Sequence, residues 1–410
     1  MTHQHSYTAA HIPGRRLLHA PGPTPLPEAV QDALKRQPLD LADERVSANI
    51  ATCEQGIAQI VQTDADVFFY ACNGHGAWEA VIENLLPIGG KALICGTGHF
   101  SDGWAIQTEG LGRQVVRTAW REGFAIDTQA LTDALLADLS KEIIAVFAVH
   151  TDTASSITSD LDALRRAIDA ADHPALLVVD VVASLAVVPI AMTRQGINVL
   201  VGASQKGLMT PPGVGIVVAD AAAQAVAANN PAPRFYWDWR LRRNPLSYRK
   251  FCGTAPQNLM FGLEAALGLI FQEGLPALYA RHALLAGAVR AAVQGWAHAG
   301  ALAFFAQEPG SRSNSVTTIT VPEGTDVDAL RQVARERFQV AFAGGLGPLA
   351  GRCFRIGHMG DQNPALVLGA LGAVQAALQV QGVPCGRDGV ARAIDYFARS
   401  AQPHDYLAGD

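Results

Sequence analysis

The sequence has few charged residues and no long run of basic ones. Charged side chains make up 17% of the 410 residues, hydrophobic side chains make up 49%, and the formal net charge is −6. Nucleic acids and anionic membrane surfaces attract clustered lysine and arginine, so this composition argues against both kinds of partner. The large apolar fraction argues against a disordered chain and is typical of a globular protein that buries a core and an oligomer interface.

Paired cysteines and long apolar runs are also missing. No CxxC pair occurs, so we expect reduced thiols and neither a zinc site nor a disulfide framework. The cysteines are Cys53, Cys72, Cys95, Cys252, Cys353 and Cys385. Residues 1–16 contain no apolar signal core, and no uninterrupted apolar run reaches the length of a membrane span. These absences predict a cytoplasmic protein.

What the sequence does contain is an alternation of strand and helix patterns. Continuous apolar runs are typical of strands that are covered on both faces. They occupy residues 67–72, 91–96, 142–150, 175–182, 197–204 and 215–220. Helical patterns lie between them at residues 76–87, 127–139 and 160–171. This order predicts an α/β fold in which a mostly parallel sheet has right-handed crossovers.

The pattern changes after about residue 260, where two long helical stretches precede a smaller α+β unit. A chain of 410 residues is long enough for two domains. We expect an extended N-terminal arm at residues 1–25, a large domain at residues 26–265 and a small C-terminal domain at residues 266–410.

Polar residues follow several predicted strands, at the sheet edge where ligands bind in open α/β folds. Gly74-His75-Gly76 opens a helix, where glycines let backbone N–H groups approach an anion. Asp180 and Lys206 end two further strands. Separately, these residues could be a turn, a helix cap and a surface lysine. Together they offer the amine, the carboxylate and the phosphate cradle that pyridoxal phosphate requires, and so predict that cofactor.

With these motifs the chain resembles the class V aminotransferases of pyridoxal phosphate fold type I, over nearly its whole length. The similar segments are "PGPTPLPEAV" (21–30), "NGHGAWEA" (73–80), "GTGHFSDGWA" (96–105), "VVDVVASL" (178–185), "GASQKGLMTPPGVG" (202–215) and "FRIGHMGD" (354–361). The similarity is closest to the bacterial amino acid–glyoxylate branch. It implies a large domain with a seven-stranded sheet between helices, a smaller α+β C-terminal domain and an obligate homodimer.

The resemblance assigns roles to residues around the cofactor ring. It implies that Lys206 forms the Schiff base and then acts as the base that moves a proton between Cα and C4′. Asp180 would pair with the pyridine nitrogen, and Thr153 would bond the ring hydroxyl or lie close to it. Phe100 aligns with an aromatic residue that stacks on the ring; the alternative is a core phenylalanine.

The phosphate contacts are implied in the same way. The cofactor-binding residues expected near the phosphate are Gly74, His75, Gly76 and Gln205. Thr254 corresponds to a residue that reaches the phosphate of the other subunit, which implies active sites shared across the dimer. Phe251 stands where many members have a tyrosine with a similar reach, so one phosphate contact is in question.

Arg355 lies within an apolar, strand-like stretch, where an unpaired arginine would be costly to bury. Its partner could be an internal Asp or Glu. The resemblance instead implies a bidentate clamp on the α-carboxylate shared by amino donor and acceptor. One site could then serve both half-reactions of a ping-pong transamination.

The sequence does not identify the amino donor. The resemblance implies transfer from a serine, alanine or aspartate type of amino acid to glyoxylate, with ureidoglycine or 3-hydroxyaspartate as alternative donors. Asn258 could bond a polar donor, and Arg15 or Arg45 could supply a second cation. A pyridoxal phosphate lyase on the same scaffold is a further alternative, but no cysteine lies in a desulfurase-like motif.

Overall fold

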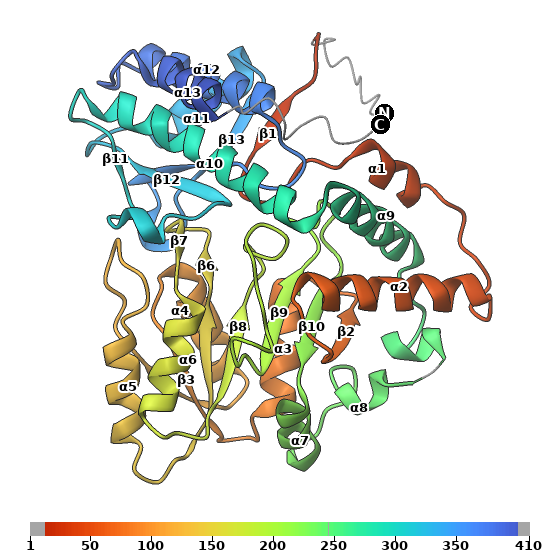
Figure 1. The fold of residues 1–410 in the computed structure, drawn as a ribbon. Helices are drawn as coiled ribbons and strands as arrows, with labels where there is room; N and C mark the ends of the chain where they lie inside the picture. The colour runs from red at the N-terminus through yellow and green to blue at the C-terminus, as the bar shows by residue number, and fades with distance from the viewer. Residues whose placement is uncertain (1–12, 245, 401–410) are drawn as a thin grey trace, which may run out of the picture.

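The computed structural model describes residues 13–244 and 246–400 and contains a seven-stranded sheet at its centre (Figure 1). The strands are β2 (Asp66–Tyr70), β3 (Lys91–Ile94), β4 (Gln114–Arg117), β5 (Ile143–Val149), β8 (Leu176–Asp180), β9 (Val199–Ala203) and β10 (Gly215–Ala219). Their order is β2-β10-β9-β8-β5-β3-β4. Strand β10 runs antiparallel to both neighbours, and the other pairs are parallel. The expected α/β fold with a mostly parallel sheet is confirmed.

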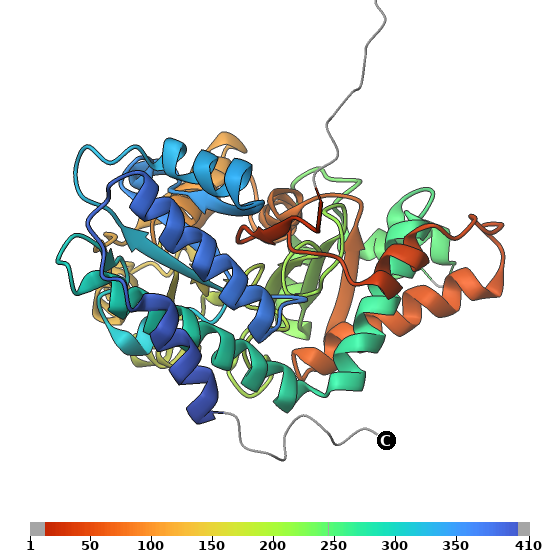
Figure 2. The ribbon, with the colours of Figure 1, turned by 90° about the horizontal axis from the view of Figure 1, so that it is seen from above.

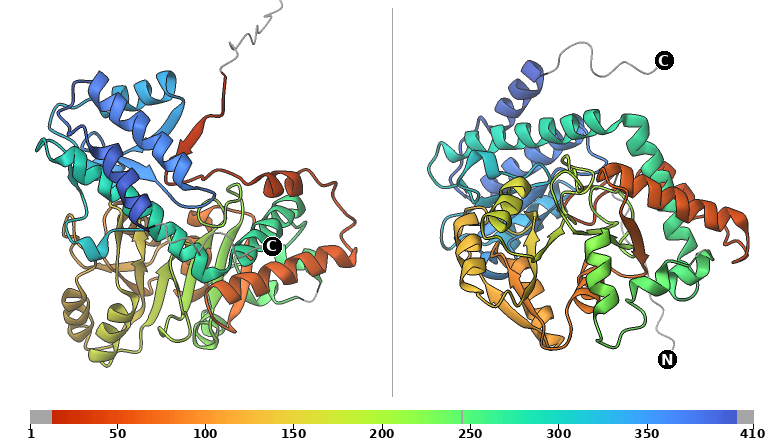
Figure 3. Two further views of the ribbon diagram at one scale, coloured as in Figure 1. Left: turned by 45° about the horizontal axis from the view of Figure 1, so that its top comes forward. Right: turned by 60° about the horizontal axis from the view of Figure 1, so that its bottom comes forward.

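Helices cover both faces of this sheet (Figures 1 and 3). They are α2 (Glu44–Ile60), α3 (Gly74–Leu85), α4 (His99–Gly110), α5 (Thr128–Ala137), α6 (Leu161–Ala170), α7 (Ala221–Asn229), α8 (Trp239–Arg242) and α9 (Gln257–Glu273). Alternate residues of one strand enter separate cores: Leu177 packs in the first and Val178 in the second. Two buried faces explain why these strands read as continuous apolar runs.

A five-stranded sheet forms the second layer of the molecule, in the order β1-β13-β14-β12-β11. Its strands are β1 (Leu17–His19), β11 (Ala303–Phe304), β12 (Val316–Thr320), β13 (Val340–Gly344) and β14 (Cys353–Gly357). The helices beside it are α10 (Leu275–Ala297), α11 (Val327–Arg337), α12 (Pro364–Val380) and α13 (Gly389–Ser400). Strand β1 pairs in parallel with β13, so the start of the described chain joins the C-terminal sheet (Figure 2).

Short elements complete the described chain. They are α1 (Glu28–Leu34), the β6 (Thr151–Asp152) and β7 (Ile157–Thr158) hairpin, and the 3-10 turns η1 (Ser247–Phe251), η2 (Pro309–Ser311) and η3 (Gly347–Leu349). Helix α10 passes from one core to the other: Leu278 packs in the first core of the large sheet, and Leu285 packs in the C-terminal core. The domain limits at residues 25 and 265 stay a prediction. Among the described residues, no helix is long and apolar enough to cross a membrane.

Candidate active site

A cavity of about 280 Å³ lies at the carboxyl ends of the central strands. Asp180 ends β8, Lys206 follows β9, and Gly74 begins α3 after β2. The lining residues are Asn73, Gly74, His75, Trp78, Phe100, Val149, Thr151, Thr153, Asp180, Val182, Ala183, Gln205 and Lys206. Seven of the predicted site residues therefore meet here, because parallel strands bring their carboxyl ends to one edge of the sheet.

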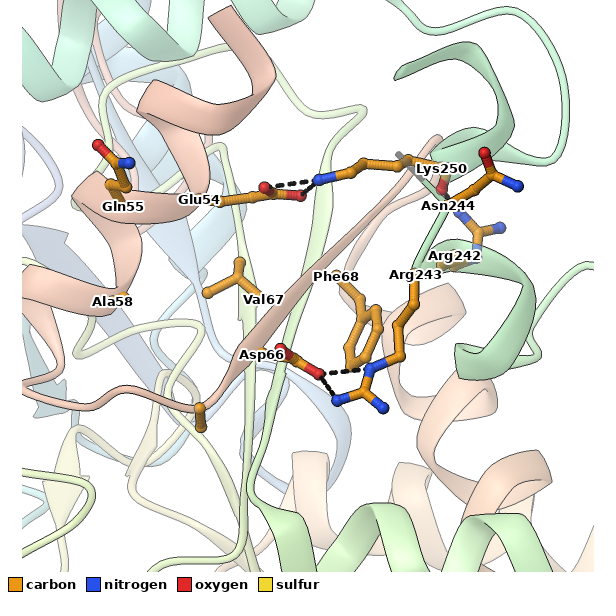
Figure 4. Close-up of a pocket in the computed structure, with 11 residues that line it drawn as sticks. Glu54, Gln55, Ala58, Asp66, Val67, Phe68, Arg242, Arg243, Asn244 and Lys250 are labelled. Atoms are coloured by element: carbon orange, nitrogen blue, oxygen red, sulfur yellow. Dashed lines mark hydrogen bonds and ion pairs between the residues drawn. The ribbon is translucent and has the colours of Figure 1, made fainter. Parts of the chain in front are cut away.

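A larger cavity, of about 490 Å³, lies beside the edge strand β2 (Figure 4). Four of its charged side chains form two pairs: Lys250 bonds Glu54 at 2.6 Å, and Arg243 bonds Asp66 at 2.6 Å. The fifth, Arg242, donates to the backbone carbonyls of Phe69 and Lys250. This cavity contains none of the predicted site residues. Paired charges leave little for a ligand to neutralise, so size alone does not make this cavity the active site.

Asp180 is a buried carboxylate with a fixed orientation. Its Oδ1 atom accepts a hydrogen bond from the backbone N–H of Val182 at 2.7 Å, and Oδ2 accepts one from the indole N–H of Trp78 at 2.8 Å. Burial raises the pKa of Asp180 to about 6, while these two donors and nearby Lys206 oppose that rise. The carboxylate is therefore poised to pair with a cationic group in the cavity.

Lys206 lies against a strap formed by residues 20–24. Its Nζ atom donates to the carbonyl oxygen of Pro21, and its own carbonyl accepts from the Thr24 hydroxyl at 2.9 Å. A Cβ atom on Gly22 would lie 2.5 Å from Cδ of Lys206, so a larger residue at position 22 would make this side chain move. Burial and the charge of Arg355 lower the pKa of Lys206 to about 8. The amine is easier to deprotonate than an ordinary lysine.

The start of helix α3 faces the same cavity. The Asn73 side chain caps the helix by accepting from the N–H of Gly76 at 3.3 Å, and Gly74 and His75 line the cavity. Gly76 is not in the cavity wall and packs against Cys72. Gln205 lines the cavity, and its buried Oε1 atom has no hydrogen-bond partner. Helix starts favour anions, so this end of the cavity suits a phosphate.

The backbone at Phe100 and next to Thr153 is held by one buried carboxylate, Asp152. Its Oδ2 atom accepts from the backbone N–H of Phe100 at 3.1 Å, and its Oδ1 atom accepts from the N–H of Ala154 at 2.8 Å. Burial raises the pKa of Asp152. The Phe100 ring is half-buried and meets the Trp78 ring edge-on, with centroids 6.4 Å apart. Asp152 thus orders two walls of the cavity.

Arg355 lies beside the cavity rather than in its wall. Its Nε atom donates to the carbonyl of Gly344 at 2.7 Å, and Nη1 donates to the carbonyl of Thr153 at 2.9 Å. It forms no ion pair with any carboxylate in the described part of the chain, so the internal Asp or Glu partner is absent there. Burial lowers the pKa of Arg355 to about 10. An arginine held by neutral carbonyls keeps a charge that a carboxylate could meet.

Three other candidates lie outside the cavity. Thr254 is exposed on the loop before α9, and Phe251 is buried in the core of the large sheet. The Asn258 side chain donates to the carbonyls of Leu34 and Arg36, which joins α9 to α1. The possible second cations are also engaged elsewhere. Arg15 pairs with Glu28 and Arg45 pairs with Asp43, all outside the cavity.

Sequence reasoning missed Trp78 and Asp152 as parts of the site. Trp78 reads as an apolar residue on the buried face of a helix, and the direction of its indole N–H is set by tertiary packing. Asp152 stands in a polar cluster directly after an apolar strand, but no role in the site was predicted for it. Its burial next to an apolar strand was the signal that could have marked it.

Comparison with known proteins now decides the family. The model of the class V aminotransferase family matches residues 17–347. The chain belongs to the class V aminotransferases. It is 36% identical over 402 residues to the serine–glyoxylate aminotransferase of Methylorubrum extorquens, covering 95% of this chain and 98% of that protein. The L-aspartate–glyoxylate aminotransferase of Paracoccus denitrificans is also 36% identical, with 93% and 96% covered.

A solved structure supports the same family. The pyridoxamine-pyruvate aminotransferase of Mesorhizobium loti superimposes with a TM-score of 0.86 at 27% identity, over 94% of this chain and 97% of that one. Class V membership implies pyridoxal phosphate, and the cavity fits it. Lys206 offers an amine and Asp180 a carboxylate. The unpartnered amide of Gln205 can present either its oxygen or its NH₂ group, and the NH₂ group suits the phosphate near the start of α3.

Proposed function

We propose that this class V aminotransferase moves the amino group of a small amino acid, of the serine, alanine or aspartate type, to glyoxylate. The names of the bacterial relatives that align with nearly the whole chain support this choice of acceptor. The observation that carries the proposal is the meeting of Lys206 and Asp180 in one cavity with Arg355 next to it. These are the groups that an amino acid transfer needs.

Each ring-side residue has a distinct task. Pyridoxal phosphate, when bound, supplies an aldehyde that reacts with amines and a ring that takes up electrons. Lys206 removes and returns the proton at Cα, and its lowered pKa gives it a larger unprotonated fraction near neutral pH. Asp180 holds the ring nitrogen in its protonated form. Phe100 stacks on the ring and Thr153 bonds the ring hydroxyl or lies close to it, while Asp152 holds the backbone at Phe100 and at Ala154.

Arg355 binds the carboxylate of each substrate in turn. Two of its N–H groups already hold backbone carbonyls, which fixes the guanidinium while other N–H groups stay available. Glyoxylate and the amino donor both carry a carboxylate next to the reacting carbon, so one arginine serves both half-reactions of a ping-pong cycle. A donor with a second carboxylate would need a further cation, which the partner subunit would have to provide.

We infer that the enzyme is a cytoplasmic homodimer with shared sites. Thr254 is exposed in the single chain and would reach the phosphate bound in the partner subunit. The segment before it carries apolar surface: Phe235 is 73% exposed and Leu246 is 47% exposed. Large exposed apolar side chains in one segment of the chain are consistent with surface that a partner covers.

Product analysis tests the reaction. The enzyme loaded with pyridoxal phosphate is given serine, alanine or aspartate singly, with and without glyoxylate, and the oxo acids, glycine and ammonia are measured. With glyoxylate, we expect one glycine for each molecule of the matching oxo acid. Without glyoxylate, we expect at most one equivalent of oxo acid per subunit. Lys206→Ala should form neither product. Ammonia in place of glycine would mean a lyase, and no oxo acid from any donor would contradict the proposal.

A further inference from the structure

Trp78 makes a contact that the proposed chemistry does not yet explain. It lies on α3 and is 2% exposed, yet it is part of the cavity wall. Its indole Nε1 donates to Oδ2 of Asp180 at 2.8 Å, across 102 residues of sequence. A buried tryptophan needs a partner for its N–H group, but a backbone carbonyl would serve as well as a carboxylate. The choice of Asp180 as the acceptor therefore has a chemical consequence.

The indole ring is held by a run of aromatic rings. Trp78 stacks on Trp104 with ring centroids 5.1 Å apart and an interplanar angle of 8°. Trp104 stacks in turn on Phe147 of strand β5, at 4.6 Å. The His75 ring also packs against Trp78, with centroids 4.6 Å apart. Because the ring is packed by these neighbours, the direction of its N–H bond is fixed before any ligand enters.

We propose that Trp78 is a positioning residue of the active site, whose indole N–H orients the Asp180 carboxylate and stabilises its ionised form toward the cofactor ring nitrogen. This inference rests on the proposed function, which makes Asp180 the partner of that nitrogen. With Val182 N–H on Oδ1 and Trp78 on Oδ2, both oxygens have a fixed donor. The carboxylate cannot turn, and its remaining lone pairs are left for the ring nitrogen.

The charged surroundings of Asp180 show why this donor matters. Burial is the largest influence on the carboxyl and raises its pKa to about 6, close to the pH at which the enzyme would work. Lys206 after β9 favours the ionised form, and Asp152 after β5 opposes it. His75 on α3 packs against the Trp78 ring. Without the indole, Asp180 would lose a donor to its charged form, and the pKa would rise further.

The same run of rings supplies a matched control. Trp104 is fully buried and stacks on Trp78, and its indole N–H has no hydrogen-bond partner among the described residues. Trp104→Phe and Trp78→Phe therefore remove the same group of atoms from neighbouring positions. Only Trp78→Phe removes a donor from Asp180. A difference between these variants reports the hydrogen bond, and a shared defect reports packing.

The experiment compares the full-length wild type, W78F and W104F, after circular dichroism and thermal unfolding have confirmed that each is folded. Affinity for pyridoxal phosphate and the rate of oxo acid formation from the donor are measured from pH 5 to 9. For W78F we expect affinity to fall about 10- to 100-fold at neutral pH, the range for losing a hydrogen bond to a charged group. The acid limb of the pH–rate profile of W78F should move up by about one to two pH units. W104F should keep the acid limb of the wild type.

A second measurement does not depend on turnover or on the folding of W78F. In ¹⁵N-labelled apoprotein, the Trp78 indole resonance should titrate with the Asp180 carboxyl near pH 6, and Asp180→Asn should abolish that titration. The inference would be overturned if the pH–rate profiles of W78F and W104F had identical acid limbs. It would also be overturned if the Trp78 indole resonance titrated in the same way in wild type and in Asp180→Asn. A wild type that forms no oxo acid while its indole still titrates would instead contradict the proposed function and leave the Trp78 contact intact.

Discussion

Replacing Gly22 with alanine should disturb Lys206, which contributes the three atoms nearest to an added Cβ. Gly22 has a φ of +122°, and an added Cβ atom would lie 2.5, 2.6 and 2.6 Å from Cδ, Cε and Nζ of Lys206. The lysine must move, and the hydrogen bond from its amine to Pro21 is lost or bent. Overpacking and the unfavourable φ each cost on the order of 1–3 kcal/mol. If about 1–3 kcal/mol of this cost opposes the position that Lys206 needs in order to bind the cofactor, the affinity for pyridoxal phosphate falls about 5- to 150-fold.

The assay is equilibrium binding of pyridoxal phosphate to apoprotein, followed by the absorbance of the bound cofactor. Gly14→Ala is the matched control, since Gly14 also has a positive φ, of +86°, but its added Cβ would have nothing within 4 Å. Both variants therefore carry a similar backbone penalty, and only Gly22→Ala pushes on Lys206. Equal affinities for the two variants would show that the strap does not constrain the lysine.

Three further predictions follow from individual residues. Arg355→Lys should raise the donor KM about 10- to 100-fold with unchanged cofactor absorbance, because lysine cannot hold two carbonyls and a carboxylate together. Lys206→Met should stabilise apoprotein against urea by about 1–3 kcal/mol at pH 7. Burial lowers the Lys206 pKa from 10.5 to about 8, so this gain should shrink as pH rises between those values. Thr254→Val should weaken cofactor binding about fivefold in a shared-site dimer, measured by fluorescence titration.

The strands that sequence reasoning found and missed differ in burial. Strands such as β8, buried at every position, read as unbroken apolar runs and were predicted within two residues of their ends. Strand β4 was not predicted, because it is an edge strand with exposed polar ends, Gln114 and Arg117. Strand β1 has three residues, and its place in the C-terminal sheet depends on pairing with β13, more than 300 residues away. Long-range pairing leaves no local pattern to detect.

The residues of the site also divide into those that the sequence predicts and those that it does not. Lys206 and Asp180 were predictable because each ends a buried strand, and the parallel sheet itself brings strand ends together. Trp78 and Asp152 were not, because their importance lies in which atom each one bonds. An apolar helix position does not reveal that its N–H points at a carboxylate 102 residues later. Hydrogen-bond direction depends on the packed neighbours, and here those are the rings of Trp104 and His75.

The distribution of hydrogen bonds in the cavity indicates which charge it lacks. Asp152 accepts from four donors and Asp180 from two, so each carboxylate has hydrogen-bond donors within the protein, although burial still raises the pKa of both. Lys206 and Arg355 donate instead to neutral carbonyl oxygens, and neither forms an ion pair with the described residues. Burial lowers the pKa of both cations, which means that the protein alone stabilises their charged forms poorly. A ligand that brings anions therefore supplies what these two residues lack, and a phosphate with a substrate carboxylate meets that requirement.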